Sequence, residues 1–184
     1  MNLIKITFIC LIIGSVSFYC QTNKPQKKLI DYKDCNQKDA LGHKYGLWIE
    51  NNGVTESYYK NDSLDGIFKV YNTTYGKLTD FGEYKNGKPC GSWYHFNEKG
   101  QLLVIEKDIQ ENKKVSVKLL NGDKIILPFK SYLVSYYPIG NIEDEGFAVY
   151  EAMEIDIYKI GIWKYYDEKG KLIKTVDETK NMHW

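Results

Sequence analysis

One pattern occurs twice in this chain: Gly-x-Trp, with a Gly seven residues after the Trp and an apolar residue nine residues after it. The copies are Gly91, Trp93, Gly100, Leu102 and Gly161, Trp163, Gly170, Leu172. A looser alignment relates residues 59–66 to residues 84–91, position for position. Self-similarity of this kind indicates a repeat architecture, in which neighbouring units bury a shared core.

The segments around these glycines have the period of β-strands. Residues 66–71 alternate, so that Phe68 and Val70 are expected on one face and Ile67, Lys69 and Tyr71 on the other. Asn-Gly pairs at 52–53 and 86–87 are strong turn signals between such strands. We therefore expect an all-β fold, an elongated antiparallel meander of hairpins, each about 20 to 25 residues long. The repeat domain is predicted to span residues 39–176.

The repeat residues have predicted structural roles. The glycines are expected where a side chain would clash with the next hairpin or where φ is positive, and the aromatic residues are expected to stack along one face. These residues are Gly46, Gly66, Gly91, Gly161, Trp48, Phe68, Trp93 and Trp163. Residues 103–136 depart from the pattern, and an inserted hairpin is expected near 115–127. The tail, 177–184, is expected to fray.

The N-terminus reads as a secretory signal. Lys5 precedes an apolar run to Tyr19, which is short for a membrane span. The predicted signal peptide is 1–20, followed by a polar linker over 21–38, and the protein is expected to be exported to the periplasm, the outer envelope or the medium. Cys20 stands where a lipoprotein cysteine would stand, but Phe18 and Tyr19 replace the small residues of a lipobox. Lipidation at Cys20, simple cleavage and an uncleaved anchor helix remain alternatives.

Charge and cysteine content narrow the function classes. The formal net charge is +1 and every basic residue is Lys, so no nucleic-acid partner is predicted. The three His residues lack metal-site spacing, and no metal or cofactor is predicted. Residues 143–145 are acidic without calcium-loop spacing, which favours a solvated turn. Cys35 and Cys90 are either one disulfide or two unrelated residues.

Several segments resemble MORN repeats, and more closely the divergent bacterial MORN-variant proteins labelled YwqK-type antitoxins. Residues 84–93, Tyr-Lys-Asn-Gly-Lys-x-x-Gly-x-Trp, carry the resemblance, with looser matches at 59–68 and 161–172 and an opening unit at 39–48. The resemblance covers 39–102 and 137–172. It implies a single sheet of successive hairpins and an antitoxin-like role towards a toxin, although a signal peptide argues against a cytoplasmic antitoxin.

No catalytic motif is found, because Gly-x-Ser-x-Gly, the Walker phosphate loop and His-Glu-x-x-His are absent. We predict a non-enzymatic, exported scaffold that binds a protein along its sheet. The alternatives are a cell-envelope module binding glycan or lipid through exposed aromatic residues, or an antitoxin-like immunity partner. The candidate binding residues, expected opposite some of the Trp side chains, are Tyr58, Tyr71, Tyr75, Tyr94 and Tyr165.

Overall fold

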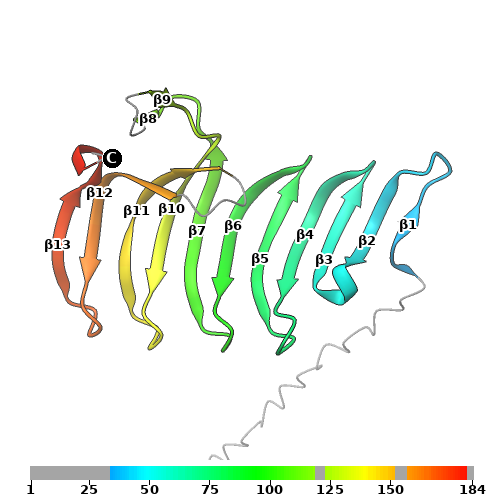
Figure 1. Ribbon diagram of the computed structural model, residues 1–184, viewed down its shortest axis with the longest axis horizontal. Helices are drawn as coiled ribbons and strands as arrows, with labels where there is room; N and C mark the ends of the chain where they lie inside the picture. The colour runs from blue at the N-terminus through cyan, green and yellow to red at the C-terminus, as the bar shows by residue number, and fades with distance from the viewer. Residues whose placement is uncertain (1–33, 119–122, 152–156, 182–184) are drawn as a thin grey trace, which may run out of the picture. The chain divides into compact units, whose positions relative to one another are not determined.

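The computed structural model describes residues 34–118, 123–151 and 157–181. The predicted signal peptide, Cys20 and most of the predicted linker lie outside these residues. The described chain forms one eleven-stranded sheet with the order β1-β2-β3-β4-β5-β6-β7-β10-β11-β12-β13, in which all neighbours are antiparallel. Figure 1 shows the strands side by side in chain order. The predicted all-β antiparallel meander is confirmed.

The strands of the sheet are β1 (Gln37–Lys38), β2 (Lys44–Glu50), β3 (Thr55–Lys60), β4 (Ser63–Tyr71), β5 (Leu78–Lys85), β6 (Lys88–Phe96), β7 (Leu102–Glu111), β10 (Phe129–Tyr136), β11 (Ile142–Tyr150), β12 (Ile157–Tyr166) and β13 (Leu172–Asp177). A second, two-stranded sheet pairs β8 (Val117–Lys118) with β9 (Lys124–Ile125). Short 3-10 turns, η2 (Asn51–Gly53) and η3 (Glu178–Asn181), complete the described elements.

The repeat glycines lie inside strands, two residues before each large aromatic residue, with positive φ: 70° at Gly46, 133° at Gly66, 66° at Gly91 and 67° at Gly161. The pairing register shifts between Gly91 and Trp93, so the glycine supplies the left-handed residue of a bulge. The positive φ expected of these glycines is confirmed. A steric reason applies only at Gly66, where an added Cβ would lie 2.9 Å from the Cβ of Tyr58.

The repeat aromatic residues share one face of the sheet, which we call the tryptophan face. Trp48 pairs with Ser57, Ser57 with Phe68, and Phe68 with Gly82, and side chains at paired positions point the same way. Trp93 lies flat over Gly82, where an added Cβ would come within 2.1 Å of the indole. The close-approach glycines are thus in the preceding strand, not in the Gly-x-Trp pattern.

The second copy repeats this packing. Trp163 lies over Gly146, where an added Cβ would come within 2.5 Å of the indole. Trp93 Nε1 donates to the carbonyl of Glu83 at 3.2 Å, and Trp163 Nε1 donates to the carbonyl of Phe147 at 2.8 Å. Each indole therefore covers a glycine and binds the backbone of the next residue. The sequence repeat corresponds to a structural unit of glycine in one strand and tryptophan in the next.

The inserted hairpin, β8 paired with β9, lies within the expected 115–127, but the inserted region around it is shorter than predicted. β7 and β10 pair with each other within the main sheet, so the region outside the repeat pattern is 112–128 rather than 103–136. The hairpin packs on the face opposite the tryptophan face, where Val117 and Leu127 contact Val149 and Ile160. A buried apolar cluster, not an extension of the sheet, holds it there.

The predicted domain ends also need correction. β1 begins at Gln37, inside the predicted linker, because the Asn36 side chain bonds both backbone groups of Ile49 in β2. The tail is not frayed as far as residue 181: β13 reaches Asp177, and Thr179 Oγ1 in η3 accepts a 2.6 Å hydrogen bond from the Gly161 N–H.

No helical turn in the described part of the chain is long and apolar enough to span a membrane.

Candidate functional site

A cavity of about 500 Å³ opens on the tryptophan face, and we call it the Trp93 cavity. The aromatic side chains of Phe68, Tyr84 and Trp93 form part of its wall. Strands β4 to β7 supply one side and the end of β11 with the start of β12 the other, so the face is concave here. The volume is that of a small-molecule or side-chain binding site.

Local packing holds the aromatic wall rigid. Tyr84 and Trp93 meet edge to face with centroids 5.1 Å apart, and Phe68 lies 5.3 Å from Tyr84 and 5.7 Å from Trp93. Each of the three side chains is at least nine-tenths buried. Because Gly82 lacks a side chain, the indole lies against the backbone of β5 on one of its faces.

A charged hydrogen-bond chain crosses the cavity wall. His95 Nδ1 lies 2.8 Å from an Asp80 oxygen in β5, and His95 Nε2 lies 2.9 Å from Glu106 Oε1 in β7. Burial lowers the pKa of His95, but hydrogen bonds to Asp80 and then Glu106 outweigh it and raise the pKa to about 9. At neutral pH His95 is therefore an imidazolium that donates from both nitrogens.

Two buried polar atoms of the cavity, Glu106 Oε2 and Tyr150 Oη, make no hydrogen bond of normal geometry among the described residues. The Tyr150 side chain is only 7% exposed. Burial raises its pKa most, and the nearby Glu106 carboxylate raises it further through its negative charge and a hydrogen-bonding interaction, while Ser131 acts in the opposite direction. Because a buried polar group without a partner is costly, each atom is a point at which a bound ligand would gain a hydrogen bond.

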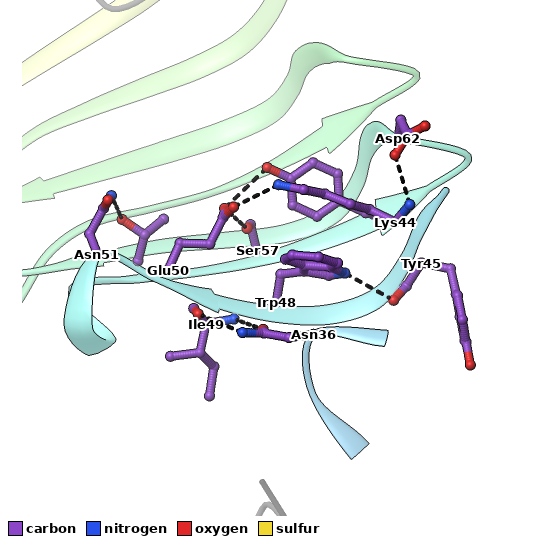
Figure 2. Close-up of polar contacts among 11 residues, drawn as sticks. Asn36, Lys44, Tyr45, Trp48, Ile49, Glu50, Asn51, Ser57 and Asp62 are labelled. Carbon is purple, nitrogen blue, oxygen red and sulfur yellow. Dashed lines mark hydrogen bonds and ion pairs between the residues drawn. The ribbon is translucent and has the colours of Figure 1, made fainter. Parts of the chain in front are cut away.

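Two further tryptophans of this face are each covered by a lysine. Lys159 Nζ lies 4.0 Å from the centroid of Trp163 and 2.6 Å from an Asp144 oxygen. Lys44 Nζ lies 4.3 Å from the centroid of Trp48 and 2.7 Å from Glu50 Oε1. Figure 2 shows Lys44 beside Trp48, with its ammonium directed at Glu50. Both sites combine a cation, an aromatic face and a carboxylate.

The structure does not bring the five candidate tyrosines together. Tyr58 and Tyr94 lie opposite the tryptophan face, since each follows a residue of that face, and Tyr71 lies near Glu56 and Lys69. Tyr75 is in the turn after β4 and is 62% exposed.

For Tyr165 the predicted face is wrong. It follows Trp163 by two residues, so both side chains point to the same side of β12, and their ring centroids lie 6.4 Å apart. Tyr165 also packs against the buried cluster of Leu133, Ala148 and Trp163. It therefore belongs to the core of the tryptophan face.

Cys35 and Cys90 do not form a disulfide with each other. Cys35 precedes β1 beside β2, and strands β3, β4 and β5 separate that segment from β6, which carries Cys90. A disulfide needs Cα atoms within about 7 Å, which strands so far apart in the sheet do not provide. The two cysteines are unrelated residues, and burial raises the pKa of the Cys90 thiol.

Among residues 34–118, 123–151 and 157–181, no three His, Cys, Asp or Glu side chains form a group that could hold a metal ion. The chain matches no protein-family model and no curated protein.

Proposed function

We propose that this chain is an exported, non-enzymatic MORN-like repeat scaffold that binds a protein partner at the Trp93 cavity. The observation that carries the proposal is the cavity itself: a concave site with a rigid aromatic wall and a few convergent polar groups, which is the usual form of a binding site. The repeated unit of glycine and tryptophan supports the MORN-like interpretation, because it makes the sequence repeat a structural one.

The polar groups favour binding over catalysis. A general base needs a free lone pair near neutral pH, whereas His95 is protonated and both of its nitrogens are engaged by carboxylates. The raised pKa of Tyr150 keeps its hydroxyl protonated and removes it as a nucleophile. Asp80 is tied to His95 and also accepts a 2.8 Å hydrogen bond from Thr79 Oγ1. The hydrogen bonds among Asp80, His95 and Glu106 therefore fix the positions of three charged groups, which suits binding rather than proton transfer.

The test compares two tryptophan substitutions on adjacent residues. Val104→Trp would fill the cavity, which Val104 lines, while Leu103→Trp adds the same bulk to the opposite face. Immobilised full chain, wild type and each variant, is exposed to an envelope extract of the producing cells, and the retained proteins are quantified by mass spectrometry. We expect a protein retained by wild type and Leu103→Trp and lost with Val104→Trp. Equal retention by all three, with equal melting temperatures, would refute the proposal.

Export is tested separately. The full chain is expressed in a bacterial host, the cells are fractionated, and the intact mass is measured. An envelope species that begins after residues 17 to 21, or that carries a diacylated Cys20, would support export. An uncleaved cytoplasmic chain would contradict export and favour the antitoxin-like alternative, with a toxin as the partner to test.

A second candidate, glycan binding, is favoured by the exposed tyrosines. Tyr58 and Tyr75 are 41% and 62% exposed, and such rings stack on sugar faces. The assay is retention on immobilised envelope polysaccharide at low salt, with Tyr58→Ser and Tyr75→Ser as the variants. Retention that both substitutions abolish, with the fold intact, supports this candidate, and no retention of the wild type rules it out.

A further inference from the structure

The molecule contains its own examples of how this face binds a cation. Lys44 and Lys159 each precede a tryptophan by four residues, and each ammonium lies over that tryptophan and against a carboxylate. Lys159 also lies 4.9 Å from the Tyr165 centroid. An ammonium over an aromatic face beside a carboxylate thus occurs in two of the four units, those of Trp48 and Trp163, although the carboxylate comes from a different position in each.

The Trp93 unit lacks this lysine. The residue four positions before Trp93 is Pro89, which carries no charge and lines the cavity. The rest of the unit is kept: Trp93 covers Gly82 as Trp163 covers Gly146, and the indole donates to the equivalent carbonyl. The space that Lys159 occupies in one unit is therefore part of a cavity of about 500 Å³ in the other.

The cavity wall carries a net negative charge, which favours binding of a cation. In the Trp163 unit Asp144 binds Lys159, but its counterpart Asp80, two residues before the covered glycine, binds His95 instead. Asp80, His95 and Glu106 together carry one net negative charge when His95 is protonated. Glu106 lines the cavity, and its buried Oε2 makes no hydrogen bond of normal geometry among the described residues, although the Tyr150 hydroxyl interacts with the same carboxyl. The exposed carboxylate of Glu151 lies at the same cavity.

We propose that the Trp93 cavity accepts the ammonium group of a lysine side chain from a partner protein, placed over Trp93 and bonded to Glu106 Oε2. This inference rests on the proposed function and names the group that the site recognises. The apolar wall, including Phe68 and Ile157, would cover the methylene chain of that lysine. The hydroxyl of Tyr150, which makes no hydrogen bond of normal geometry but interacts with the Glu106 carboxyl, would accept a hydrogen bond from the same ammonium.

The first experiment uses two probes that differ only in the charged group. The full chain, labelled with ¹⁵N, is titrated at pH 7 with Nα-acetyl-lysine methylamide or with Nα-acetyl-norleucine methylamide. The chemical shift of the Trp93 indole N–H is measured at each probe concentration. We expect the lysine probe to bind roughly tenfold more tightly, because a charge-assisted hydrogen bond and a cation–π contact are added. Equal or tighter binding of the norleucine probe, or no binding of the lysine probe, would overturn the inference.

Substitutions then identify the carboxylate and the missing lysine. Glu106→Gln should lower the affinity for the lysine probe by roughly tenfold, because a neutral amide cannot form the charge-assisted hydrogen bond. Glu83→Gln is the matched control, since Glu83 is exposed on the opposite face of β5. Pro89→Lys should abolish binding by supplying the internal ammonium seen in the other units, whereas Pro89→Gln, of similar size without charge, should retain it. Loss with both Pro89 variants, or an unchanged affinity in Glu106→Gln, would show that space rather than charge decides binding and would contradict the inference.

The two proposals fail separately. If Val104→Trp releases the partner but Pro89→Lys and Glu106→Gln do not, partner binding at the cavity stands and the lysine inference is wrong. If Val104→Trp releases nothing, the proposed function is wrong whatever the probes do. If Glu106→Gln does not fold, the Pro89 pair alone decides, because Pro89 takes no part in the His95 hydrogen-bond chain.

Discussion

Gly82→Ala tests the packing of tryptophan over glycine, the feature on which the repeat unit rests. The added Cβ would lie 2.1 Å from Cδ2 of Trp93, whereas carbon atoms in contact are about 3.5 to 4.0 Å apart. The indole must therefore move by more than an ångström. Such a movement breaks its hydrogen bond to the Glu83 carbonyl and its contacts with Phe68 and Tyr84.

The expected cost follows from these contacts. Overpacking a well-filled site costs about 1 to 3 kcal/mol, and losing the indole hydrogen bond adds about 1 kcal/mol. Alanine recovers about 0.5 kcal/mol by restricting the unfolded chain, which is available here because Gly82 does not have a left-handed φ. We expect a net loss of about 1.5 to 3.5 kcal/mol, or a melting temperature lower by about 3 to 14 °C for a chain of this size.

The assay is urea and thermal unfolding of the full chain, followed by circular dichroism, with a double-mutant cycle. In a Trp93→Leu background the Gly82→Ala cost should nearly vanish, because the indole that clashes is gone. Gly91→Ala is the control: its cost, about 1 kcal/mol from the left-handed backbone, should be the same in both backgrounds, since nothing lies within 4 Å of an added Cβ. A Gly82→Ala cost below about 0.5 kcal/mol, or one unchanged by Trp93→Leu, would refute the packing argument.

Three further predictions concern charge and exposure. The pKa of His95 is raised from 6.5 to about 9 in the fold, so its contribution to stability, about 3 kcal/mol, is complete below pH 6.5 and is lost as pH rises through 9. Urea unfolding from pH 6 to 10 measures this loss, and the same pH dependence in His95→Gln would contradict the prediction. Lys159→Met removes the ammonium from the Trp163 indole and leaves Asp144 without its cation. It should lower the free energy of unfolding by about 1 to 2 kcal/mol, and adding Asp144→Asn to the same chain should restore part of that loss. Tyr75→Ser should change the free energy of unfolding by less than about 0.5 kcal/mol, because the Tyr75 side chain is exposed. Tyr165→Ser should lower it by more than about 1 kcal/mol, because Tyr165 packs on the core cluster. Equal changes in the two variants would contradict the placement of Tyr165 in the core.

The sequence alone determined the features that depend on neighbouring residues. Alternation in 66–71 and the Asn-Gly turns predicted the meander, and the spacing of Gly91 and Trp93 predicted an aromatic face and positive φ. These properties are local, because a strand has a period of two and a left-handed φ is set at a single residue. The same period places Tyr165 on the face of Trp163, and the prediction to the contrary was wrong for that reason.

Only the tertiary structure decided the site. The glycine under each indole lies in the preceding strand, 11 residues before Trp93 and 17 before Trp163, because the connections between the strands differ in length. A pattern search at fixed spacing therefore misses Gly82 and Gly146. Likewise His95 reads as a lone strand histidine until β5 and β7 place Asp80 and Glu106 on either side of it. The cavity depends on the curvature that brings Tyr150 of β11 to the same space as Phe68 of β4, and curvature arises from bulges and pairings along the whole sheet rather than from any one segment.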